Sequence, residues 1–354
     1  MRSEAGRSDA LWLLGVWLLS RVLTQLFALV AARGEWMLPY PGFPLRFDFW
    51  GVWARFDSTP YLEIIENGYH PGYLGPGGWF PGYPYLVKVL CMSVSPVACG
   101  VMVSNLCLLG ALWFLLRLAA LDNVDGRGAV LLLLCFPSAF ILTAVYSESL
   151  FLLCACAALY YARSDRPWAA CLWATAASLT RLAGLSLVPA LAWEFWRRRR
   201  AVEAHFTGLL LPLLGVLGFF LYLQQTTGNF FEYFHVQHTF SQILSVWKAV
   251  TIHGSLMLEQ KTGLLFLTLE LGILAWGWAR IPASYRIYLL LSISMALYHT
   301  QGVCTQRFML VHFPLFLALR SRLSDKTYPL ALLLFVGGQV VLLTYWVYGY
   351  RATY

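Results

Sequence analysis

Charged residues are scarce in this sequence. They make up 12% of its 354 residues, whereas soluble domains carry roughly 25%. Hydrophobic residues make up 59%. Apolar runs of about 20 residues recur from one end of the chain to the other, and such a run is long enough to cross a bilayer as a helix. This composition excludes an ordinary soluble protein. It predicts an all-α polytopic integral membrane protein, folded as a single transmembrane domain over residues 1–354.

Lysine is especially rare, since the sequence has four lysines and 21 arginines. The formal net charge is +8. The arginines lie mostly between apolar runs, where basic residues set the orientation of a membrane protein. The positive balance therefore does not indicate nucleic-acid binding, and the expected environment is the lipid bilayer.

The cysteines show no metal-binding spacing. Five of the eight fall inside apolar runs and are expected to be small membrane-core residues rather than bridges or ligands: Cys107, Cys135, Cys154, Cys156 and Cys171. Cys91, Cys99 and Cys304 are the ones expected near a surface. We expect neither a metal nor another cofactor.

The apolar runs predict about eleven crossings. The first, Ala10–Ala32, is too long for a signal-peptide core and is expected to remain in the protein. Two long polar regions follow, at 33–83 and 226–262. The runs 167–181 and 184–196 are shorter than a bilayer, so they are either tilted and broken or a pair that reaches only part-way from one side.

Short connections rich in arginine predict the orientation. The positive-inside rule places such connections on the cytoplasmic side. If the N-terminus is cytoplasmic, all of these connections lie on that side: Arg117/Arg127, Arg163/Arg166, Arg197–Arg200, Arg280/Arg286 and Arg320/Arg322/Lys326. Both long loops then face the other side, which points to an extracytoplasmic site.

The first long loop carries the most informative stretch, Arg55–Pro84. Thr59-Pro60 is a helix-start signal and Gly68 a stop, so a short amphipathic helix is expected along the membrane surface. The proline- and glycine-rich run Pro71–Pro84 is expected to lack regular structure.

Asp57, just before this helix, is the leading catalytic candidate. A carboxylate in a partly dry pocket can take the proton of an attacking hydroxyl. The competing interpretation is that Asp57 only caps the helix. Glu63 and Glu66 are expected on its solvated face.

Three further charges interrupt apolar sequence on the outer side. Arg181 and Arg307 suit a phosphate, because a buried guanidinium needs an anion. They could instead pair with Glu148 or Asp57, or reach toward lipid headgroups. Glu148 either lines the site or shares hydrogen bonds with its neighbouring serines.

The second loop contributes His235 and His238, which share one face if the segment is helical. They are candidates for contact with the donor phosphate. A metal pair is the weaker alternative, because no carboxylate stands at ligand spacing. The abundant Trp and Tyr residues fit an interfacial belt, with sugar stacking as the sharper hypothesis for Trp79.

The same residues resemble a known family. The pattern Asp57-x-x-x-Tyr61-Leu62-x-Ile64-x-x-x-Gly68-Tyr69, followed by Phe80-Pro81-Gly82-Tyr83-Pro84, resembles the first-loop signature of the GPI mannosyltransferase 2 (PIG-V) family. Later stretches agree in order: Phe136-Pro137-Ser138, Tyr146-Ser147-Glu148-Ser149, Arg307-Phe308 and Phe313-Pro314. The chain departs from the family at Phe56, where tryptophan is usual, and at Arg181-Leu182-Ala183-Gly184, where Arg-Ser-Asn-Gly is usual.

The resemblance implies a GT-C-type glycosyltransferase that takes mannose from a polyprenyl-phosphate donor. It implies an acceptor that is lipid-linked or a membrane-proximal glycan, a catalytic Asp57, and a substrate lining that adds Glu148, Tyr61, Tyr69, Trp79, Phe80 and Tyr83. The membrane would be the plasma or inner membrane of a prokaryote, or the endoplasmic reticulum of a eukaryote. A transporter of lipids or small solutes is the alternative, since intramembrane Arg and Glu would serve it too.

Overall fold

The computed structural model describes residues 2–34, 36–37, 48–72, 75–91, 94–197, 206–239, 242, 255–300 and 304–350. Within these ranges the regular structure is helical and no strand occurs. Five helices are long and apolar enough to cross a membrane: Arg7–Arg33, Pro96–Leu121, Phe206–Thr227, Glu259–Arg280 and Thr327–Val347. An all-helical chain with several candidate membrane spans is therefore confirmed. The full set of eleven crossings remains a prediction.

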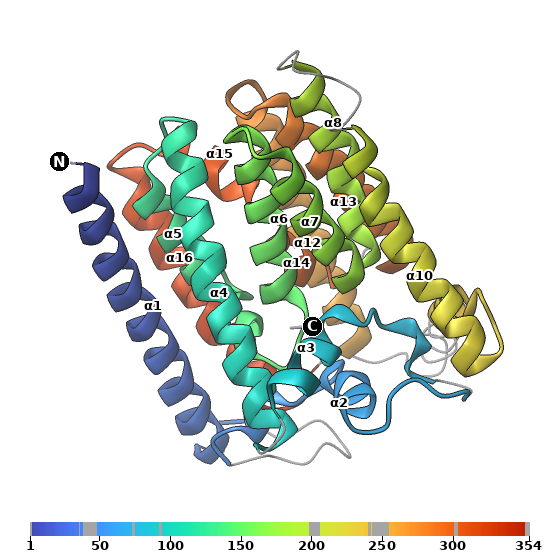
Figure 1. The fold of residues 1–354 in the computed structure, drawn as a ribbon. Helices are drawn as coiled ribbons and strands as arrows, with labels where there is room; N and C mark the ends of the chain where they lie inside the picture. Colours follow the sequence, from blue (N-terminus) through green and yellow to red (C-terminus); the bar gives the residue numbers. More distant parts are fainter. Residues whose placement is uncertain are drawn as a thin grey trace.

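The long helices frame the molecule. They are α1 (Arg2–Arg33), α4 (Pro96–Leu121), α10 (Leu210–Thr227), α12 (Ser255–Gly277) and α16 (Thr327–Val347). In Figure 1 α1 and α16 form one flank of the bundle and α10 the other. Many of their leucine side chains stay exposed, as expected for helices that face lipid.

Shorter helices fill the space between them. They are α5 (Gly126–Cys135), α6 (Glu148–Arg163), α7 (Pro167–Thr180), α8 (Leu187–Arg197), α13 (Ala283–Thr300) and α15 (Pro314–Arg322). At about 1.5 Å per residue, α7 is about 21 Å long and α8 about 16 Å, against a hydrocarbon core of about 30 Å. In Figure 1 α6 and α7 reach only about the middle of α4. Residues 167–196 thus form two short helices joined by η4, and their depth in the membrane remains a prediction.

The turns between these short helices form a layer of irregular backbone. Three single-turn helices lie there, η3 (Ala139–Thr143), η4 (Leu182–Ser186) and η6 (Met309–Val311), together with the four-residue α14 (Thr305–Phe308). Backbone of this kind must find hydrogen-bond partners in the protein, because lipid supplies none. Ser138 Oγ donates to the Gln306 carbonyl at 2.5 Å, and the Tyr288 hydroxyl to the Val311 carbonyl at 2.8 Å.

The first long loop folds against the lower end of the bundle in Figure 1. The expected amphipathic helix is α2 (Ser58–Asn67), which buries Tyr61, Ile64 and Ile65 and ends at Gly68, whose φ of +75° suits glycine. The expectation of no regular structure over 71–84 is wrong in part. The single turn η2 (Pro76–Gly78) and the start of α3 (Gly82–Leu90) lie inside that run. Pro84 is tolerated because it falls in the first turn of α3, where N–H groups have no helical partner.

The cysteines differ from expectation at two places. Cys91 and Cys99, left unpaired by the sequence reasoning, form a disulfide that ties the end of α3 to the first turn of α4. Cys99 and Cys304 are buried, although positions near a surface were expected for both. The five cysteines of the apolar runs are free thiols, as expected.

Candidate functional site

Four charged side chains converge from the breaks between helices. Asp57 precedes α2, Glu148 begins α6, Arg181 lies between α7 and η4, and Arg307 belongs to α14. Because each helix ends or begins at the same depth of the bundle, side chains as far as 250 positions apart in the sequence come into contact. Glu148 also gains from its place at the N-terminus of a helix, where negative charge is favoured.

These side chains form a row of alternating charges. Asp57 Oδ2 lies 2.7 Å from Arg307 Nη1, and Arg307 Nε lies 3.1 Å from Glu148 Oε1. The same Glu148 oxygen accepts a hydrogen bond from Arg181 Nη1 at 2.6 Å. The sequence left salt bridges open as the alternative to phosphate contact for both arginines, and the structure shows these salt bridges. Phosphate binding remains a prediction.

Burial increases toward the middle of the row. The exposed fraction of the side chain is 2% for Glu148, 9% for Arg307, 14% for Arg181 and 16% for Asp57. The second oxygen of Glu148, Oε2, is buried and accepts no hydrogen bond from the described residues. A buried charge is costly unless it is paired, so the two arginines and two carboxylates stabilise one another here. The formal charge of the four groups sums to zero.

Aromatic rings fix the guanidinium groups. The Arg181 guanidinium lies over the ring of Phe308 at 4.6 Å, and that of Arg307 lies 5.2 Å from the same ring and 5.4 Å from Tyr146. Such contacts stabilise a cation where water is excluded.

The backbone around Asp57 is held by Tyr146. The Tyr146 hydroxyl accepts from the Asp57 N–H and donates to the Arg55 carbonyl, both at 3.1 Å. Within the described chain the Asp57 carboxylate makes no capping hydrogen bond to α2. The capping alternative is therefore not what the structure shows, because the carboxylate turns to Arg307 instead.

Several predicted lining residues are buried in packing contacts beside the row. The Tyr61 hydroxyl donates to Ser147 Oγ at 2.7 Å, and burial, followed by the nearby Glu148 carboxylate, raises the pKa of Tyr61. The Tyr83 hydroxyl donates a hydrogen bond to the Gly100 carbonyl at 3.0 Å.

The other predicted lining residues pack around Trp79 and Phe80. The Tyr69 hydroxyl donates to the Trp79 carbonyl at 2.7 Å, and Phe80 packs against Phe219 and Tyr233. Trp79 itself is half-buried. Their direct contact with a substrate remains a prediction.

The histidines of the second loop are placed differently. His235 and His238 lie on a helical segment, 232–239, and both side chains are exposed, in contrast to the four buried charges. Gln237 Nε2 anchors the segment by donating to the Gly78 carbonyl at 2.7 Å. The structure thus brings the segment onto the first loop without seating either histidine in the buried row. Among the described residues, no group of three or more His, Cys, Asp or Glu side chains is arranged to hold a metal ion.

The solvated face of α2 is confirmed. Glu66 is exposed, and Glu63 is half-exposed. Hydrogen bonds with Asn67 and His70 lower the pKa of Glu63.

Sequence reasoning missed a second buried polar group. Glu270 in α12 pairs with His312 Nδ1, and His312 Nε2 lies 2.9 Å from Ser292 Oγ in α13. All three are about 1% exposed. The available signal was a lone glutamate inside an apolar run.

Neither a scan against models of known protein families nor a search of curated proteins finds a match to this chain. The likeness to the PIG-V family therefore rests on the quoted motifs.

Proposed function

We propose that this protein is an inverting GT-C-type glycosyltransferase. It transfers a hexose, mannose by the family resemblance, from a polyprenyl-phosphate donor to a lipid-linked or membrane-proximal acceptor on the extracytoplasmic side. The observation that carries the proposal is the row Asp57–Arg307–Glu148–Arg181, in which a partly exposed carboxylate contacts one guanidinium group and Glu148 joins that group to a second.

Asp57 supplies the base. It is the most exposed member of the row and precedes α2 on the first loop, which suits access by an acceptor from the aqueous side. The acceptor oxygen attacks the anomeric carbon of the donor sugar while its proton passes to an Asp57 oxygen. The bond from that carbon to the phosphate oxygen breaks on the opposite face, which inverts the configuration.

Arg181 and Arg307 supply the electrostatic stabilisation. Breaking the sugar–phosphate bond leaves a lipid phosphate with an additional negative charge, and guanidinium donors fixed in advance act where charge develops. Glu148 keeps the two arginines side by side through one shared oxygen. No nucleotide is needed, because the leaving group is the lipid phosphate itself.

The disulfide supports the proposed orientation. Cys91–Cys99 joins α3 to α4 at the end of the bundle that carries α2 and the first loop. Disulfides persist in oxidising compartments, which lie on the extracytoplasmic side. A cysteine in place of the exposed Glu66 is expected to react with an impermeant thiol reagent added to that side of sealed vesicles, with the wild-type chain as control. Reaction only from the cytoplasmic side would reverse the orientation.

The function is tested with purified protein and a panel of polyprenyl-phosphate sugars. The expected result is release of free lipid phosphate together with a glycosylated acceptor of inverted anomeric configuration. The transporter alternative predicts that the lipid-linked sugar crosses the membrane of a proteoliposome chemically unchanged. Flux without a covalent product would replace the glycosyltransferase proposal.

A further inference from the structure

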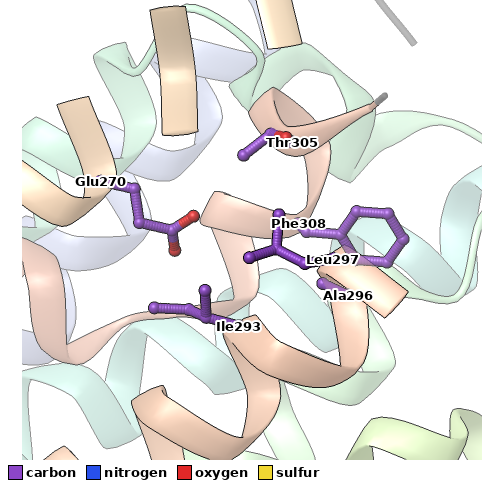
Figure 2. Close-up of a pocket in the computed structure, with 6 residues that line it drawn as sticks. All are labelled: Glu270, Ile293, Ala296, Leu297, Thr305 and Phe308. Carbon is purple, nitrogen blue, oxygen red and sulfur yellow. The ribbon is translucent and has the colours of Figure 1, made fainter. Parts of the chain in front are cut away.

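A narrow pocket lies between α12, α13 and α14 (Figure 2). It is lined by Glu270, Ile293, Ala296, Leu297, Thr305 and Phe308. The carboxylate of Glu270 points into this space. Its free volume admits about one water-sized group. The walls are apolar apart from the Glu270 carboxylate and the Thr305 hydroxyl.

Glu270 is an unusual residue to find here. It is 1% exposed and lies inside the candidate span Glu259–Arg280. An ionisable side chain within a membrane span is costly, and it indicates function more often than packing. His312 holds one oxygen of the carboxylate in place and is itself held by Ser292, and the carboxylate still reaches the pocket. Apolar residues could join the same helices at lower cost, so packing alone does not account for a carboxylate at this position.

Phe308 connects this pocket with the row of charges. Its ring lies 4.6 Å from the Arg181 guanidinium and 5.2 Å from that of Arg307. The residue also lines the pocket, and in Figure 2 its ring points away from Glu270. In a polyprenyl-phosphate sugar the hexose is bonded directly to the phosphate. A phosphate held by the two arginines therefore brings the sugar next to Phe308. An aromatic ring can cover the C–H face of a sugar, and a carboxylate can accept a hydrogen bond from a hydroxyl.

We propose that Glu270, Thr305 and Phe308 form a subsite that recognises a hydroxyl group of the donor sugar. This inference rests on the proposed function and adds a recognition site to it. The pocket takes one hydroxyl, with Glu270 as the acceptor, and the remainder of the ring lies against Phe308. Glu270 thereby distinguishes a sugar-bearing lipid phosphate from a bare one, whereas Arg181 and Arg307 hold both.

The test measures binding of two probes to the full-length purified chain. One is a short-chain polyprenyl phosphate, and the other is the same lipid phosphate carrying a single mannose. Glu270→Gln is expected to weaken binding of the mannose-bearing lipid by roughly 10- to 100-fold, the loss of a hydrogen bond to a charged group. Binding of the bare lipid phosphate is expected to stay unchanged. Arg181→Ala, the matched control, is expected to weaken both probes.

The two probes separate the possible outcomes. Equal loss for both would make Glu270 a positioning residue for the Arg307 segment and overturn the subsite. Unchanged binding of both would overturn it as well. If Glu270→Gln does not fold, Thr305→Val tests the same pocket, and selective loss of the mannose-bearing probe again supports the subsite. Binding of the bare lipid phosphate alone by the wild-type protein would reject the subsite and leave the phosphate site standing. Failure to bind either probe would remove the proposed function together with it.

Discussion

Ion pairs occur at both ends of the short helices, and they differ in kind. At the arginine-rich end three arginines each contact one carboxylate: Arg163 pairs with Asp122 at 2.6 Å, Arg320 with Asp125 at 2.8 Å and Arg127 with Asp9 at 2.8 Å. At the opposite ends of the same helices, Arg307 contacts two carboxylates and Glu148 contacts two arginines.

The difference indicates separate roles. A one-to-one pair between two elements holds them together, and neither charge is shared with a second opposite charge. In the shared row Arg307 can exchange its contact with Asp57 for a ligand oxygen while Glu148 keeps it in position. A phosphate could thus enter the row without leaving a buried charge unpaired. Such an unpaired charge is what makes the loss of one partner of an isolated buried pair so costly. Under the proposed function, binding belongs to one end and structure to the other, and variants at each end can test that division.

The largest effect is expected at Asp57. Asp57→Asn keeps the shape of the side chain and removes its basicity, and general-base assistance is worth about 100- to 10,000-fold in rate. The variant is expected to fold and to bind the donor lipid, yet to transfer almost no sugar in a single-turnover assay. Glu63→Gln on the same helix is the matched control and should remain active. Transfer by Asp57→Asn at a near wild-type rate would eliminate Asp57 as the base and make Glu148 the next candidate.

Next come the two arginines of the row. Loss of a fixed donor to the leaving phosphate costs on the order of 2–4 kcal/mol in transition-state stabilisation, or about 30- to 1000-fold in rate. Arg181→Ala and Arg307→Ala should show this loss in turnover per folded molecule. The result that contradicts a binding role is a lowered melting temperature with unchanged activity of the folded fraction.

Arg163 provides the comparison at the other end. Its partner Asp122 is 8% exposed, so Arg163→Met leaves a buried carboxylate without its cation, a change worth about 3 kcal/mol of stability. Unfolding should occur at lower denaturant, whereas the Michaelis constant for the donor should match the wild type. A selective rise in the Michaelis constant would show that both ends contribute to substrate binding. The proposed division of roles between the two ends would then be wrong.

Local signals in the sequence were sufficient for part of this picture. Thr59-Pro60 and Gly68 bracket α2 because helix starts and stops depend on neighbouring residues. The apolar runs 167–181 and 184–196 were too short for a full crossing. That left two arrangements, tilted and broken helices or a pair that reaches only part-way from one side. Asp57 and Arg307 could each be singled out as a charge in unusual surroundings.

Contacts across the chain could not be inferred in the same way. The pairing of Asp57 with Arg307 depends on how four helix breaks reach one depth, and no local pattern encodes that. The salt-bridge and phosphate alternatives for the arginines were indistinguishable for this reason. Glu270 and His312 were missed because they lie 42 positions apart, and neither suggests the other until α12 and the segment after α14 pack together.

The smallest expected effect concerns Asp125, in the arginine-rich connection between α4 and α5. Its partial burial opposes ionisation, but the Gly128 N–H and the Arg320 guanidinium outweigh it and lower the pKa of Asp125. A carboxyl whose pKa is lower in the folded than in the unfolded state stabilises the fold above its unfolded value of about 3.9. This contribution is lost as the pH falls from there through the folded pKa. Because the side chain is 46% exposed, the solvent-screened contribution is about 0.5 kcal/mol. Unfolding measured from pH 6 to pH 3 should show the wild type losing that small advantage over Asp125→Asn near the acidic end. A gap that persists unchanged to pH 3 would mean that the charge of Asp125 is not the source of the stabilisation, because asparagine can cap α5 equally well.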